Sequence, residues 1–105
     1  MKLTVILSIK ESYNRIAQLL DQAGIKRFST VHIIGYKNDK SSHLMNWFGE
    51  KSDSAKTNSI LFFCFTTEKE SISVLEEINR CNAQSGKKFP AHAFVMDVEK
   101  HSILL

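Results

Sequence analysis

The chain has 105 residues and a mass of 12.0 kDa, the size of one domain with one hydrophobic core. A hydrophobic fraction of 43% beside 24% charged residues is typical of globular proteins and does not indicate a disordered chain, and no apolar run is long enough to span a membrane. The formal net charge of +3 is only mildly basic, so the composition does not indicate a nucleic-acid-binding protein. We expect a single domain over residues 1–105.

The first half of the chain predicts a strand, a helix and a second strand. Apolar and polar residues alternate from Lys2 to Ile9, which is the period of a strand. Ser8 and Glu11 have the spacing of a helix capping box, and a helical apolar pattern then runs to Gly24. A second alternating segment extends from about Thr30 to Tyr36.

A polar interruption from Lys37 to Asn58 follows the second predicted strand. Connections of this length are uncommon in compact domains unless they bind something, so we expect the segment to be functional. A cluster with the only tryptophan lies at its centre and is a candidate anchor for a protein partner. Alternatively, the cluster folds back as a short helical turn onto the protein itself. The candidate partner-binding residues are His43, Met45, Trp47 and Phe48.

The second half repeats the order of the first. The segment Ser59 to Thr66 is apolar on both faces, which is typical of a central strand. Thr67 and Glu70 have capping-box spacing, and the apolar stripe of a second helix ends near Cys81. After a loop with the only proline, a last strand is predicted from Ala93 to Val98.

This order of elements predicts an α+β ferredoxin-like βαββαβ sandwich, in which two helices cover one face of an antiparallel four-stranded sheet. Yet the segments Ile60–Phe65 and Phe94–Met96 keep bulky apolar residues on both faces. An isolated chain would expose the second face, so we expect a symmetric oligomer in which another copy covers it.

Short motifs along nearly the whole chain are similar to those of one family. Ile33 to Lys37 (IIGYK) is similar to a second strand that closes on Lys-Gly-Phe-Gly before a long loop. Val74 to Ile78 (VLEEI) is similar to the second helix of that family, and Phe94 to Glu99 (FVMDVE) to its last strand. On these motifs the chain resembles a divergent member of the PII signal-transduction superfamily.

The resemblance implies a cytoplasmic, non-enzymatic regulator. It implies a trimer whose intersubunit clefts bind a small ligand, adenine nucleotides in the family, and a T-loop that contacts a partner such as a transporter or an enzyme. The T-loop would correspond to residues 37–58. The ligand-binding residues would be Gly35, Tyr36, Lys37, Gly86, Lys87, Lys88 and His92.

The chain departs from the PII pattern at the phosphate contacts. The glycine-rich B-loop keeps its first Gly-Lys at Gly86 and Lys87 but loses its later glycines and its last lysine. The two C-terminal arginines of the family fall on Ile103 and Leu105, which cannot clamp phosphate. The T-loop tyrosine motif is absent as well. These departures argue against ATP sensing and uridylylation, and the identity of the ligand or cofactor stays open.

Three other functions are compatible with parts of the sequence. Four histidines and the free-thiol candidates Cys64 and Cys81 supply metal-ligand types, so the alternative function is a metal-binding accessory protein of metal efflux or homeostasis. Without a CxxC or HxH motif, such a site would have to be shared between segments or subunits, and no metal ligands are assigned. Phe62, Phe63 and Phe65 superficially resemble the aromatics of an RNA-recognition domain, but the first strand offers no aromatic partner. A module that binds a protein partner without any small ligand is the third alternative.

Overall fold

A computed structural model describes residues 1–36, 56–86 and 89–103, with backbone alone at 56 and 57. The elements within these ranges are β1 (Lys2–Ile9), the 3₁₀ helix η1 (Lys10–Ser12), α1 (Tyr13–Gln22), β2 (Ser29–Tyr36), β3 (Lys56–Thr66), α2 (Glu68–Gln84) and β4 (His92–Asp97). Several residues predicted to be functional lie outside the described residues, namely Lys37, His43, Met45, Trp47, Phe48, Lys87 and Lys88.

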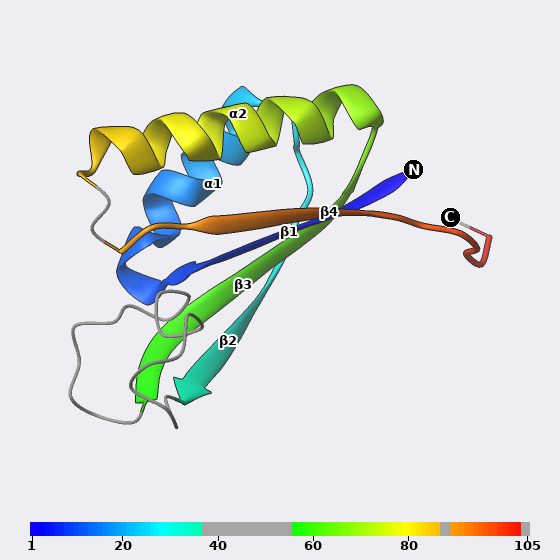
Figure 1. The fold of residues 1–105 in the computed structure, drawn as a ribbon. Coiled ribbons are helices and arrows are strands. Elements are labelled where there is room, and N and C mark those ends of the chain that lie inside the picture. The colour runs from blue at the N-terminus through cyan, green and yellow to red at the C-terminus, as the bar shows by residue number, and fades with distance from the viewer. Residues whose placement is uncertain (37–55, 87–88, 104–105) are drawn as a thin grey trace.

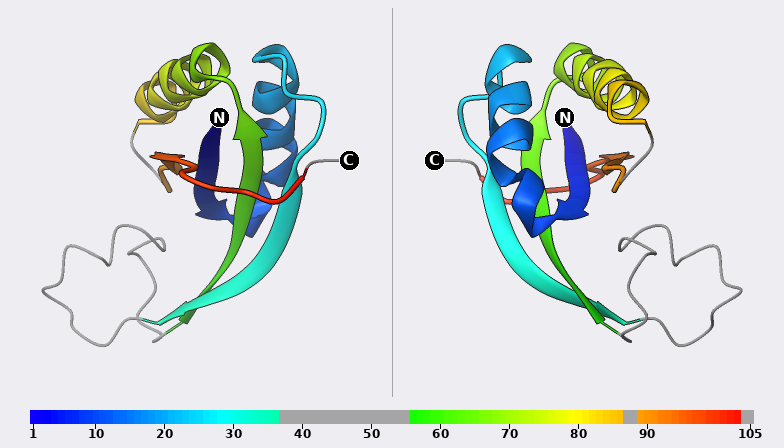
Figure 2. Two further views of the ribbon diagram at one scale, coloured as in Figure 1. Left: turned by 90° about the vertical axis from the view of Figure 1, so that its right-hand side faces the viewer. Right: turned by 90° about the vertical axis from the view of Figure 1, so that its left-hand side faces the viewer.

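The described strands form one antiparallel sheet in the order β2-β3-β1-β4. Both described α-helices pack on the same face of this sheet (Figures 1 and 2). This arrangement is the predicted α+β ferredoxin-like sandwich. It also confirms that β3, the strand predicted to be central, has a neighbour on each side.

The core lies between the helices and one face of the sheet. Phe62 of β3 is at its centre, with its ring stacked on Tyr13 at 5.5 Å and tilted against Phe28 at 5.8 Å between centroids. Every second residue of β1 and β3 points toward the helices, and each helix contributes one apolar stripe. The cluster consists of Ile6, Ile16, Leu19, Leu20, Ile25, Ile60, Phe62, Cys64, Val74, Ile78 and Ala91.

The two predicted helix starts have different outcomes. The capping box of α2 is confirmed, because Glu70 N–H donates to the Thr67 hydroxyl at 3.1 Å and Thr67 N–H donates to the Glu70 carboxylate at 2.9 Å. The prediction for the first helix is wrong. The Ser8 hydroxyl donates to the Ile9 carbonyl, and η1 intervenes before α1 begins at Tyr13. Ser8 belongs to β1, and this strand pairing outweighs the local capping pattern.

The strand boundaries also differ from the prediction. β3 begins at Lys56, so residues 56–58, predicted to end the long loop, pair with Ile34 to Tyr36 of β2. β1 ends at Ile9, opposite Ser59. The end of the β2–β3 pair therefore extends past β1 as a two-stranded arm (Figure 1). β4 spans His92–Asp97, one residue earlier than predicted at both ends.

The sheet face that carries no described helix, called the open face, is strongly apolar. Its cross-strand rows include Phe94–Val5–Phe63 and Met96–Leu3–Phe65. Several of its side chains are exposed, including Phe65 at 58%, Val31 at 47% and Met96 at 45%. A surface of this kind is unusual for an isolated soluble chain.

An exposed ion pair joins β1 to β4 near the N-terminus. Lys2 of β1 donates to the carboxylate of Asp97 in β4, and this contact lowers the pKa of Asp97. Exposed pairs contribute little to stability, so the pairing of β1 with β4 rests on the strand hydrogen bonds. Neither described α-helix combines the length and apolar character required to cross a membrane.

The first prediction compares two isoleucines on helices. Ile16 of α1 is fully buried, whereas Ile72 of α2 is 52% exposed. Ile16→Ala should lower the free energy of unfolding by about 2–5 kcal/mol in urea titrations. Ile72→Ala should change it by no more than about 0.5 kcal/mol. Equal losses from the two substitutions would contradict this packing.

Candidate functional site

The predicted ligand-binding residues that the structure describes fall into two groups. Gly35 and Tyr36 end β2, whereas Gly86 and His92 flank the connection from α2 into β4. β2 and β4 are the opposite edges of the described sheet, with β3 and β1 between them. Within one chain, two strands therefore separate the two described groups.

A cleft of about 350 Å³ lies beside the first group, at the root of the long loop. This loop-root cleft is lined by Lys10, His32, Ile33, Ile34, Asn58 and Ser59. It forms because β1 ends while β2 and β3 continue, so η1 leaves the sheet above the uncovered arm. The pairing of Ile34 with Asn58 and of His32 with Ile60 places these residues on the helix-bearing face of the arm.

The lining of the loop-root cleft is suited to a small anion. The Lys10 ammonium carries a positive charge, and the side chains of His32 and Asn58 can donate hydrogen bonds. Ser59 alternates to the opposite face of β3 from Asn58 and Ile60, so its buried hydroxyl is not counted among the donors of the cleft.

The second group is held by one asparagine. Asn82, near the end of α2, donates from its side-chain amide to the Ala91 carbonyl at 2.8 Å and accepts from the Ala91 N–H at 3.0 Å. Ala91 is 3% exposed, so both backbone groups depend on this contact. We call it the Asn82 clamp. It fixes both ends of the segment that contains Gly86, where φ is +69° as a left-handed turn requires.

Sequence reasoning missed several residues of these two regions. Lys10 and Ser59 carry no motif that indicates a site, and Asn58 is at the end of the predicted loop. His32 is one of the four histidines that supply a metal-ligand type, without being assigned to a site. Their proximity depends on where β1 ends relative to β3, which no local pattern encodes. For Asn82 a signal existed, since an asparagine just before a helix end commonly bonds to nearby backbone.

The described residues give the metal-binding alternative no support. None of the groupings of histidine, cysteine and acidic side chains within 1–36, 56–86 and 89–103 could hold a metal ion. Burial raises the pKa of the Cys64 thiol, with a smaller contribution from the charge of Glu70. A protonated, buried thiol is a poor metal ligand and a poor nucleophile.

No protein-family model and no curated protein matches the sequence. Solved structures do match. A Thermus thermophilus protein described as PII-like and signalling aligns with a TM-score of 0.64 at 15% identity, over 92% of this chain and 85% of its own. A DUF3240 family protein from Shewanella baltica aligns with a TM-score of 0.65 at 13% identity, over 99% and 96% of the two chains.

A third match is CPII of Thiomonas intermedia, a nitrogen regulatory PII-like protein whose structure contains ADP, AMP and bicarbonate. It aligns with a TM-score of 0.65 at 18% identity, over 98% of this chain and 94% of CPII. At such identities the likeness establishes the fold and not the ligand. The chain therefore has the fold of PII-like proteins, as its sequence motifs indicated.

The second prediction concerns the Asn82 clamp. Asn82→Ala leaves the buried N–H and carbonyl of Ala91 without partners and should lower the free energy of unfolding by about 2 kcal/mol or more. Asn82→Asp keeps an acceptor for the N–H but sets a carboxylate oxygen against the buried Ala91 carbonyl, so its loss should be at least as large. Urea titrations of both variants test this order, and a neutral Asn82→Ala would contradict the clamp.

Proposed function

We propose that this protein is a non-enzymatic PII-like regulator that assembles as a homo-oligomer, binds a small anionic ligand between subunits and acts on a protein partner through the segment 37–55. Three copies are proposed, as the PII resemblance implies. The observation that carries the proposal is the separation of the ligand-binding candidates to opposite edges of the sheet. In an oligomer, a second copy would supply its Gly86 and His92 beside the Gly35 and Tyr36 of the first.

The open face supports assembly. Rows of Phe, Leu, Val and Met side chains cover its described part, and burial of such a surface contributes roughly 25 cal/mol per Å². An exposed patch of this kind commonly marks a protein interface. In a symmetric assembly the same face would be buried on every copy.

The ligand proposed is a small anion rather than ATP. The loop-root cleft offers a cation and several hydrogen-bond donors, but the later B-loop glycines and the C-terminal arginines of the PII pattern are absent from the sequence. The CPII structure contains bicarbonate beside ADP and AMP, so the fold accommodates anions of this size. Bicarbonate and AMP are therefore the first candidates.

Coupling to a partner would pass through the two-stranded arm. Lys10 and Asn58 line the loop-root cleft, and Tyr36 and Lys56 end the arm next to it. A ligand that bridges η1 and the arm would favour those arm conformations that keep both contacts. The segment between residues 36 and 56 would then be presented to the partner in fewer arrangements.

The third prediction tests assembly. Light scattering coupled to size exclusion at micromolar concentration should give about three times the 12.0 kDa chain mass. Phe65→Glu places a charge on the open face and should dissociate the assembly while circular dichroism stays unchanged, because Phe65 is outside the core. Ile72→Glu is the matched control, since Ile72 is similarly exposed on α2.

A wild-type protein that is monomeric under these conditions would overturn the proposed assembly. So would dissociation by Ile72→Glu to the same extent as by Phe65→Glu, since the interface would then not be the open face.

The fourth prediction tests the ligand by thermal shift. Bicarbonate or AMP should raise the melting temperature, and ATP should have a smaller effect. Above the dissociation constant, each tenfold increase in ligand adds about 1.4 kcal/mol to stability. The shift should be reduced in Lys10→Gln and unchanged in Lys26→Gln, because Lys26 pairs with Asp21 away from the cleft.

Fluorescence of the only tryptophan, Trp47, should change in the same titrations if the ligand is coupled to the loop. The ligand proposal fails if none of these anions stabilises the protein, or if Lys26→Gln weakens the shift as much as Lys10→Gln.

A further inference from the structure

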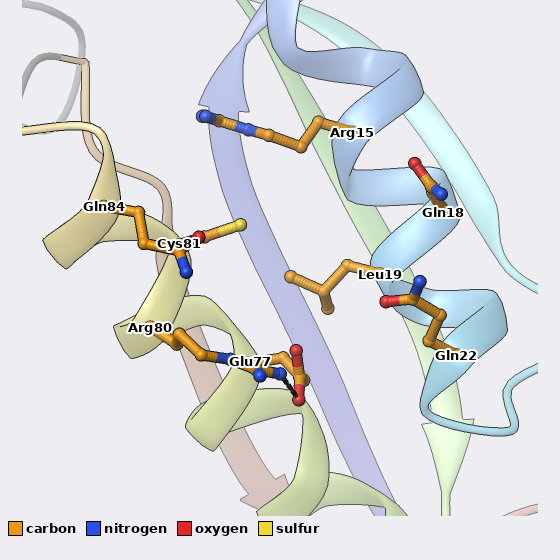
Figure 3. Close-up of a pocket in the computed structure, with 8 residues that line it drawn as sticks. All are labelled: Arg15, Gln18, Leu19, Gln22, Glu77, Arg80, Cys81 and Gln84. Atoms are coloured by element: carbon orange, nitrogen blue, oxygen red, sulfur yellow. Dashed lines mark hydrogen bonds and ion pairs between the residues drawn. The ribbon is translucent and has the colours of Figure 1, made fainter.

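A second cleft, of about 330 Å³, separates the two α-helices on the side of the molecule away from the open face. This interhelix cleft is lined by Arg15, Gln18, Leu19, Gln22, Glu77, Arg80, Cys81 and Gln84. Its volume is within the range of small-molecule sites. In Figure 3, Arg15 and Leu19 extend from α1 toward α2, and the Cys81 thiol extends from α2 toward α1.

The two ends of the interhelix cleft differ in charge. The helices run in opposite directions, so Arg15 lies across from Cys81 and Gln84, whereas Gln22 lies across from Arg80. Arg80 forms an ion pair with Glu77. Arg15 forms no ion pair among the described residues. Two guanidinium groups and one carboxylate thus leave a single uncompensated positive charge, at the Arg15 end.

The floor of the cleft is apolar. Leu19 is 4% exposed and belongs to the core, and the half-buried Cys81 packs against that core. The rim carries three glutamines, whose side-chain amides can both donate and accept hydrogen bonds. The cleft therefore combines one available cation, an apolar surface and neutral polar groups.

We propose that the interhelix cleft binds a small organic acid with one carboxylate and a short carbon chain. The carboxylate would accept two parallel hydrogen bonds from the Arg15 guanidinium. The carbon chain would lie on Leu19 and Cys81, and the side-chain amide of Gln84 would bond to a remaining carboxylate lone pair. A second carboxylate would be repelled by Glu77, so a monocarboxylate is preferred over a dicarboxylate.

This site is independent of the proposed regulatory function. It uses no residue of the loop-root cleft, the Asn82 clamp or the open face. The helices that line the interhelix cleft lie on the opposite side of the sheet from the open face (Figure 2), so an assembly formed through the open face would leave the cleft uncovered. Its ligand could therefore bind whether or not the chain assembles.

The test is a titration of the full chain with butanoate, followed by ¹⁵N NMR. The side-chain amide signals of Gln18, Gln22 and Gln84 report directly on the cleft. Butanoate should shift them and bind more tightly than acetate, which lacks the carbon chain. Arg15→Gln should weaken butanoate binding at least about tenfold, because the charge-assisted contact is lost.

Arg27→Gln is the matched control, since Arg27 is an exposed arginine outside the cleft and should leave binding unchanged. Glu77→Gln tests the charge balance. Without this carboxylate Arg80 is unpaired, so succinate should bind the variant several-fold more tightly than it binds the wild type.

The proposal is overturned if butanoate leaves the three amide signals unmoved, or if Arg27→Gln weakens binding as much as Arg15→Gln. An unchanged affinity for succinate in Glu77→Gln would overturn the proposed charge balance and with it the preference for a monocarboxylate. Failure of these tests would not contradict the ligand proposed for the loop-root cleft, because that ligand is tested separately by the thermal shift of Lys10→Gln.

Discussion

The unequal cover of the sheet is the constraint on which the rest of the molecule depends. Two helices can bury only one face, and Ile6, Ile60 and Phe62 use that face for the core. The opposite face is built from equally apolar residues such as Val5, Phe63 and Phe65. These residues also favour burial, but no described helix packs on them. The proposed assembly and the proposed ligand site between subunits both depend on another copy covering that second face.

The elements of the fold were predictable because their signals are local. Period-two alternation in β1, the all-apolar run of β3 and the Thr67–Glu70 pair each indicate one structure, and the structure agrees with all three. The Ser8–Glu11 spacing is an equally local signal, yet it was misleading. Ser8 pairs with Ile60, and cross-strand pairing decided its backbone conformation.

The site was less predictable because it depends on where strands end. The family pattern indicated Gly35 and His92, but it could not show that these residues occupy opposite edges of one sheet. Lys10, Asn58 and Ser59 meet because β3 continues past the end of β1, and no pattern in either segment reports the length of the other. The interhelix cleft was unpredictable for a similar reason. Arg15 and Gln84 are on different helices and lie across from each other only after those helices pack.

The two-stranded arm has a consequence for the order in which the molecule opens. Residues 34–36 and 56–58 hydrogen-bond to each other, whereas Ile60 and the residues after it have β1 on their other side. An isolated pair of strands is marginally stable, so separation can begin at the arm and stop at the level of Ile9 and Ser59 without loss of the core. Separation of β2 from β3 therefore costs little free energy as far as Ser59. Beyond this buried residue, further separation would also disrupt the core.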